Sequence, residues 1–211
     1  MNFKKGFKHY FFRLINIIFR VKVINPEKEP SGGYLLCANH VSNLDPVVIV
    51  ASFKDKVSFM AKKELFKVPV IRSVIKMFGA FPVDRGSVDL GAMKKAISLL
   101  EEKNTVGMFP QGTRFKGYEL RKTSAKRGAG MIVHRSLCDI LPVAIITKDN
   151  NCRLFGKKYV VIGDIIKYES LNCTEKSKEE FERISGIIFD KICDLYDEYS
   201  YLVNGKNEQR N

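Results

Sequence analysis

The chain has 211 residues, a length that suits one domain, because a single hydrophobic core can grow to about 250 residues. The hydrophobic fraction of 45% is ordinary for a globular protein. The 36 Lys and Arg residues outnumber the 23 Asp and Glu residues by 13, which predicts an anionic partner: nucleic acid, an anionic membrane surface or a phosphorylated substrate. The 5 cysteines lack a Cys-x-x-Cys pair and a histidine at zinc-ligand spacing, which argues against a zinc site and fits a reducing compartment.

The N-terminal segment, residues 1–20, predicts an amphipathic helix. One side of its helical projection is apolar and the other is basic, and no acid precedes Glu27. Such a helix is typical of a segment that lies in a membrane interface, and its charges interrupt it too often for the roughly 20 apolar residues that a bilayer span needs. We therefore expect a monotopic membrane-surface helix at residues 1–20, followed by one domain over residues 21–211. An ordinary helix packed on that domain is the alternative.

Beyond this segment, strands and helices alternate along the chain. The apolar runs predict strands at residues 21–25, 34–38, 57–61, 80–83, 105–109, 139–147 and 159–166. Periodic apolar residues and cap signals predict helices at residues 47–53 and 70–78, from Ser87 to about Asn104, at residues 125–136, and from Thr174 to about Tyr201. This alternation predicts a single α/β domain with a central β-sheet flanked by helices.

The stretch from Asn39 to Pro46, Asn-His-Val-Ser-Asn-Leu-Asp-Pro, joins the second strand to the first of these helices. Asp45 followed by Pro46 predicts a helix start, with Asp45 as the N-cap. On one continuous helix, residues five apart point roughly 140° away from each other. A loop that folds back from a strand end onto a helix start can instead set the Asp45 carboxylate against the His40 imidazole, where it would fix the tautomer. A polar turn without catalytic function is the alternative for this stretch alone.

Three further blocks follow in the chain: Gly79-Ala80-Phe81-Pro82-Val83-Asp84-Arg85, Phe109-Pro110-Gln111-Gly112-Thr113-Arg114 and Leu141-Pro142-Val143-Ala144. A histidine and an aspartate separated by four residues, followed in this order by these blocks, resembles the glycerolipid acyltransferases. The likeness covers roughly residues 20–165 and is greatest to the 1-acyl-sn-glycerol-3-phosphate acyltransferases. That resemblance implies transfer of an acyl group from acyl-CoA or an acyl carrier protein to the sn-2 hydroxyl of lysophosphatidic acid, giving phosphatidic acid.

The resemblance also implies roles for particular residues. His40 would be the general base and Asp45 the residue that orients it. Cations would receive the phosphate of the acceptor, with Arg85 and Arg114 matched to the family and Lys62 as a helper. The remaining residues carried over are Gln111 and Gly112 for acceptor binding, with Asn39, Thr113 and Pro142 in support. A thioester supplies its own leaving group, so neither a metal nor a cofactor nor an enzyme nucleophile is expected; Cys37 is expected in the core.

The third block departs from the family pattern, because Gln111 stands where the family has glutamate. Glutamine keeps an acceptor oxygen and adds donors but has no charge, so it cannot be a base or an ion-pair partner. We expect Gln111 to bind a neutral hydroxyl or to position Arg114. The acceptor could also be glycerol-3-phosphate or another lysolipid.

The partners and the location follow from the same features. We expect the anionic cytoplasmic face of the cell membrane as the site of action, with the protein peripheral or monotopic and no nucleic acid as partner. A non-catalytic basic module that binds membranes or nucleic acid is the competing interpretation of the charge. It leaves the four ordered blocks without explanation, and the aromatic residues interleaved with basic ones are concentrated near the N-terminus.

Overall fold

The computed structural model describes residues 17, 20–77, 79–83, 89–153 and 155–204. Within this part of the chain, seven strands form one sheet with the order β1-β7-β6-β2-β5-β3-β4. The strands are β1 (Val21–Ile24), β2 (Leu35–Ala38), β3 (Val57–Lys62), β4 (Phe81–Val83), β5 (Thr105–Met108), β6 (Ile140–Thr147) and β7 (Lys158–Ile162). Neighbouring strands are parallel except for β6 and β7, which are antiparallel.

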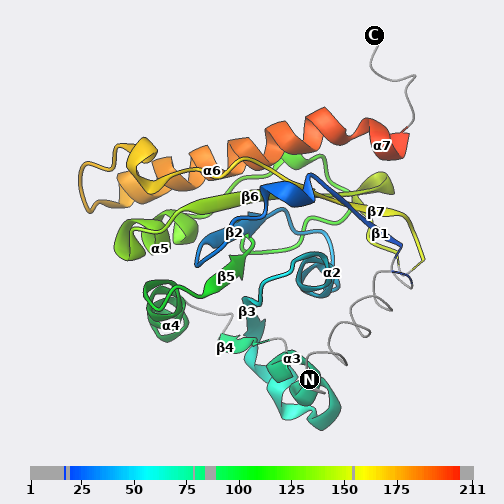
Figure 1. Cartoon of the computed structure of the whole chain (residues 1–211), viewed down its shortest axis with the longest axis horizontal. Coiled ribbons are helices and arrows are strands. Elements are labelled where there is room, and N and C mark those ends of the chain that lie inside the picture. The colour runs from blue at the N-terminus through cyan, green and yellow to red at the C-terminus, as the bar shows by residue number, and fades with distance from the viewer. Residues whose placement is uncertain (1–16, 18–19, 78, 84–88, 154, 205–211) are drawn as a thin grey trace.

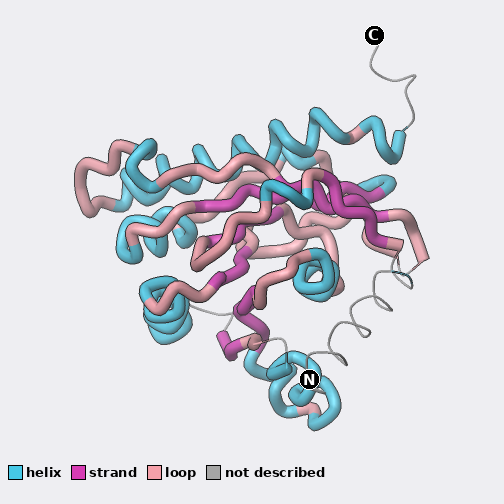
Figure 2. Tube along the Cα trace, viewed as in Figure 1, coloured by secondary structure: helices cyan, strands magenta, loops and turns pink. Residues whose placement is uncertain are grey.

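Helices cover both faces of this sheet (Figure 1). They are α2 (Asp45–Ser52), α3 (Pro69–Met77), α4 (Leu90–Glu101), α5 (Gly128–Ser136), α6 (Lys178–Tyr199) and α7 (Tyr201–Asn204). Figure 2 shows the strands as a central layer, with the long α6 along one side and α2 on the other. The predicted α/β architecture, a single domain with a central sheet flanked by helices, is confirmed, and the sheet is mostly parallel.

Alternate residues of the strands pack into different hydrophobic clusters, as the period of two along a strand requires. In β2, Leu35 and Cys37 face a cluster built with α4, α5 and α6. Leu36 and Ala38 face a second cluster built with α2. Cys37 is fully buried, and this burial raises the pKa of its thiol, so it belongs to the core as expected.

Because β2, β3, β4, β5 and β6 run in the same direction, their carboxyl ends meet at one edge of the sheet. The segments that follow β2 and β5 contain the first and third sequence blocks. The sheet thus brings His40 and the loop after Met108 next to each other, although almost 70 residues separate them in the chain.

Several element boundaries differ from the sequence prediction. Asp45 does not cap α2: the N-cap position is Leu44, and no side chain caps that helix end. The cap of α4 is Asp89, whose carboxylate accepts a hydrogen bond from the backbone N–H of Ala92, whereas the predicted cap, Ser87, lies outside the described residues. Helix α6 begins after Ser177 and not at Thr174.

The predicted start of α5 and the predicted end of β7 were also wrong. Helix α5 begins at Gly128 and not at residue 125, and β7 ends at Ile162, beyond which only Ile166 forms an isolated bridge to Ile140. The predicted membrane-surface helix at residues 1–20 lies almost wholly outside the described residues. None of the helices that the structure describes combines the length and the apolar character required to cross a bilayer.

Candidate active site

The imidazole of His40 is held by the carboxylate of Asp45. His40 Nδ1 lies 2.8 Å from Asp45 Oδ2, and the side chains are 5% and 0% exposed, respectively. A carboxylate oxygen accepts, so Nδ1 carries the hydrogen and Nε2 is the nitrogen left to take up a proton. The expected contact between the two residues is therefore present.

Asp45 makes this contact because its side chain turns back over the loop that precedes it. The same Oδ2 accepts hydrogen bonds from the backbone N–H groups of Val41 and Ser42, each at 2.7 Å. Three donors thus converge on one oxygen, whereas Oδ1 is buried and has no hydrogen-bond partner among the described residues. The Asp45 carboxylate thus stabilises the loop that precedes it in the chain and does not cap the first turn of α2.

The loop after β5 fixes His40 from the opposite side. The ring of Phe109 stacks on the imidazole with a centroid distance of 4.0 Å and an interplanar angle of 11°, and the backbone N–H of Phe115 donates to the His40 carbonyl at 2.9 Å. The ring of Phe59 supports Phe109 in turn, with centroids 5.3 Å apart. Aromatic contact of this kind restricts the imidazole to one orientation.

Gln111 completes the frame around His40. Its Oε1 accepts a hydrogen bond from the backbone N–H of His40 at 2.8 Å, and its Nε2 donates to Thr123 Oγ1 at 2.7 Å. The Thr123 hydroxyl then donates to the carbonyl of Leu120, also at 2.7 Å. Gln111 is 2% exposed. The expectation that it binds an acceptor hydroxyl or positions Arg114 needs correction, because these contacts direct both ends of its carboxamide into the protein.

Asn39 extends the sheet beyond the end of β2. Its side-chain amide pairs with the backbone of β6 as a neighbouring strand would: Nδ2 donates to the Ile145 carbonyl at 2.9 Å, and Oδ1 accepts from the Ile145 N–H at 2.7 Å. The chain can therefore leave the sheet at His40 without leaving buried backbone groups of β6 unpaired. Pro142 lies buried within β6, opposite Cys37, and its carbonyl accepts from the Gly163 N–H at 3.0 Å. Its place is in the core and not at the site.

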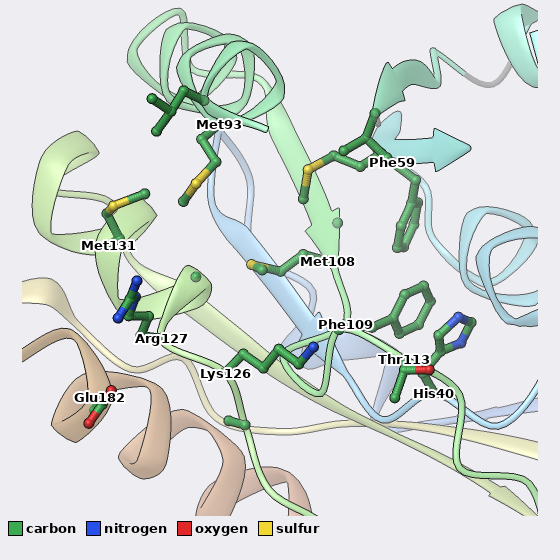
Figure 3. Close-up of a pocket in the computed structure, with 17 residues that line it drawn as sticks. His40, Phe59, Met93, Met108, Phe109, Thr113, Lys126, Arg127, Met131 and Glu182 are labelled. Atoms are coloured by element: carbon green, nitrogen blue, oxygen red, sulfur yellow. The ribbon is translucent and has the colours of Figure 1, made fainter. Parts of the chain in front are cut away.

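His40 opens into a cavity of about 1190 Å³. Most of its wall is apolar, and the side chains of Met93, Met108 and Met131 point into it in Figure 3. The rest of the lining is Phe59, Met60, Val83, Leu90, Gly107, Phe109, Gly112, Thr113, Ala125, Lys126, Arg127, Gly128 and Glu182. The methionines are flexible and polarisable, so they can adapt to an alkyl chain. The cavity thus combines the imidazole of His40 at one end with an apolar wall.

Of the predicted cations, Arg114 is the one whose side chain the structure places. Thr113 lines the cavity, but Arg114 lines a second pocket of about 500 Å³ on the other side of Thr113, together with Lys116 and Asn151. Lys62 is the last residue of β3 and pairs with Val83 through the backbone. Arg85 lies outside the described residues.

Two residues that the structure brings to this region were not predicted from the sequence. Thr123 anchors Gln111, and nothing in its sequence neighbourhood distinguishes it from other loop threonines. Lys126 lines the cavity because α5 begins two residues after it, which leaves Lys126 in the preceding loop. Its position beside the third block became visible only with the fold, since its backbone N–H donates to the Pro110 carbonyl at 2.8 Å.

Comparison with known proteins places this site in a family. The model of the Acyltransferase family matches residues 20–146. The 1-acyl-sn-glycerol-3-phosphate acyltransferase of Bacillus subtilis is 34% identical over 86% of this chain and 91% of its own length. The enzyme of the same name from Helicobacter pylori is 30% identical, over 69% of this chain and 62% of its own length.

The fold has a counterpart among solved structures. The crystal structure of the 1-acyl-sn-glycerophosphate (LPA) acyltransferase from Thermotoga maritima matches with a TM-score of 0.69 and 21% sequence identity, over 94% of this chain and 83% of that one. The match of the family model to more than half of the residues, with the sheet and the His40–Asp45 pair, shows that the chain belongs to the Acyltransferase family.

Proposed function

We propose that this protein transfers an acyl group from a thioester, either acyl-CoA or an acyl carrier protein, to the sn-2 hydroxyl of lysophosphatidic acid, and so makes phosphatidic acid. The relative from Bacillus subtilis, which is named for this activity, is similar to this chain over 86% of its residues. The observation that carries the proposal is the fixation of His40. Its N–H, its carbonyl and Nδ1 are engaged by Gln111, Phe115 and Asp45, so that Nε2 is the atom left to act in the cavity.

The chemistry follows from this arrangement. An alcohol with a pKa far above neutrality needs a base as it attacks, and Nε2 takes its proton while the alkoxide oxygen forms a bond to the thioester carbonyl. Asp45 stabilises the resulting imidazolium, because its Oδ2 lies 2.8 Å from Nδ1. The C–S bond then breaks, the proton on Nε2 passes to the departing thiolate, and the imidazole is neutral again.

The cavity suits the lipid portion of the substrates. An acyl chain would lie along the apolar wall, with its reacting carbonyl near His40 and Thr113. Burial of methylene groups against this wall would contribute about 0.8 kcal/mol each. In this proposal cations hold the phosphate of the acceptor, with Arg114, Arg85 and Lys62 as the residues carried over from the family pattern, and Gly112 provides a tight turn with φ +68°.

The acceptor is tested with a panel of alcohols. Purified protein is incubated with a labelled acyl thioester and either lysophosphatidic acid, glycerol-3-phosphate or a lysolipid with another head group. We expect phosphatidic acid from lysophosphatidic acid as the main product. Faster acylation of glycerol-3-phosphate or of another lysolipid would move the assignment to that acceptor, and no transfer to any of the alcohols would contradict the proposal.

For the membrane, we infer that residues 1–20 bind the protein to an anionic surface at the cytoplasmic face, as a peripheral or monotopic protein. The basic side of this segment would contribute roughly 1 kcal/mol per cation near anionic lipid. Cosedimentation of the full chain with anionic and with neutral vesicles tests it. Replacement of Phe3, Phe7 and Phe11 by serine should reduce binding to anionic vesicles, and unchanged binding would contradict the inference.

A further inference from the structure

Lys126 lies across the turn that follows β5. A Cβ atom placed on Gly112 would come within 2.9 Å of Lys126 Cδ and within 3.6 Å of Nζ, so the absence of a side chain at Gly112 gives the lysine its path. Gly112 has φ +68°, which also favours glycine. The backbone of Lys126 is held against the same turn by its hydrogen bond to the Pro110 carbonyl. The stem of this side chain therefore crosses the turn beside Gly112.

The ammonium group of Lys126 points into the cavity. In Figure 3 the side chain extends toward the part of the cavity where Phe109, Thr113 and His40 lie. Glu182, the acidic residue among the described residues that line the cavity, lies well away from the Lys126 nitrogen in the same view, and its carboxylate is 3.9 Å from Lys178 Nζ. No acidic side chain of the described residues is within ion-pair distance of Lys126. Among the described residues, Lys126 is therefore a cation of the reaction cavity without an acidic partner, on the side that holds His40.

The acceptor of the proposed reaction carries an anion close to its reacting hydroxyl. In a 1-acyl-glycerol 3-phosphate, four bonds separate the sn-2 oxygen from phosphorus, so these two atoms are at most about 5 Å apart at roughly 1.5 Å per bond. Once the hydroxyl reaches His40, the phosphate must lie in its immediate surroundings. Arg114 lines the second pocket, whereas Lys126 lines the cavity that contains His40.

On these grounds we propose that Lys126 binds the phosphate of the acceptor beside His40 and selects phosphate-bearing alcohols; this inference rests on the proposed function. The ammonium group is a compact charge on a flexible stem and can follow a phosphate as it settles. Stabilisation of the oxyanion on the thioester carbonyl is a different role, one that requires donors held rigidly in place. The two roles predict different behaviour toward an acceptor without phosphate.

The test compares wild type with Lys126→Met, using lysophosphatidic acid and the matching 1-monoacylglycerol as acceptors. Loss of one hydrogen bond to a charged group, worth about 1.5–3 kcal/mol, corresponds to a roughly 10- to 150-fold decrease in kcat/KM for the phosphate-bearing acceptor. We expect most of this decrease in KM, partial rescue in Lys126→Arg, and little change for monoacylglycerol. An equal decrease for both acceptors, or no decrease for lysophosphatidic acid, would overturn the proposal.

Lys122→Met is the matched control, because Lys122 belongs to the same loop, pairs with Glu119 at 3.0 Å and does not line the cavity. It should behave as wild type. Calorimetric titration with a short-chain lysophosphatidic acid makes the test independent of turnover. If wild type binds this lipid without acylating it, the proposed function fails, while weaker binding by Lys126→Met still supports the phosphate contact. Equal binding by wild type and variant would overturn that contact in either case.

Discussion

The charge of Asp45 should contribute more to the rate than to the fold, and Asp45→Asn separates the two effects. An asparagine oxygen can still accept from the N–H groups of Val41 and Ser42, which now lie 2.7 Å from Oδ2, but the negative charge beside the imidazole is lost. Two unit charges about 4 Å apart at an effective dielectric of about 20 interact by about 4 kcal/mol. We therefore expect kcat to fall roughly 10²- to 10³-fold in this variant.

The larger deletion, Asp45→Ala, should add a loss of stability. It removes the common acceptor of three donors, two of them backbone N–H groups, and each buried donor left unsatisfied costs about 1–3 kcal/mol. We expect the free energy of unfolding, measured with urea, to fall by about 3 kcal/mol or more, whereas Asp45→Asn should lose much less.

Asp139→Asn is the control for this pair of variants. Asp139 also accepts from a backbone N–H, that of Tyr168, but it precedes β6 at the opposite end of the sheet from His40. Loss of the Asp139 charge in this variant should leave kcat unchanged. The reasoning would be refuted if folded Asp45→Asn kept its rate within tenfold of wild type, or if Asp139→Asn slowed the reaction equally.

Three further predictions concern the frame of the site. Gln111→Glu should retain activity, since a carboxylate can accept hydrogen bonds from both the His40 N–H and the Thr123 hydroxyl, whereas Gln111→Leu should lose activity. Steady-state rates test this, and an inactive but folded Gln111→Glu would contradict it. Gly107→Ala should lower both stability, by about 1–3 kcal/mol, and kcat, because its Cβ would meet the Phe59 ring that supports Phe109. A variant with wild-type melting and rate would show that the ring moves freely. Lys158→Met should lower the free energy of unfolding, measured with urea, by about 2–4 kcal/mol, because the buried ammonium donates to the carbonyls of Arg153 and Gly156 at 2.5 and 2.8 Å. A decrease of less than about 1 kcal/mol would contradict that role.

The sequence was sufficient for the fold class and for the meeting of His40 with Asp45. Strands and helices alternate clearly enough to predict a layered α/β domain, and parallel strands bring successive blocks to one edge of the sheet. The direction of β7 was not predictable in the same way. Its apolar pattern would be the same whether it paired parallel or antiparallel with β6. In the structure β7 is antiparallel to β6 and parallel to β1.

The local errors have a physical origin in competition between hydrogen-bond donors. Asp45 in front of a proline has the pattern of an N-cap, but the N–H groups of Val41 and Ser42 and the imidazole of His40 together attract its carboxylate more strongly than the helix end does. The same holds for Gln111, whose partners are a backbone N–H from another block and the unremarkable Thr123. Such contacts depend on tertiary structure and have no signal within a sequence window.

The most direct test of the account is the formation of phosphatidic acid from lysophosphatidic acid and an acyl thioester on anionic vesicles, by wild type and by His40→Ala. Loss of a general base should slow the reaction by about 10²- to 10⁴-fold. Binding to the vesicles and the urea midpoint should change little by comparison. The account predicts an active wild type and a folded, membrane-bound, nearly inactive variant. A His40→Ala protein that makes phosphatidic acid at the wild-type rate would contradict it.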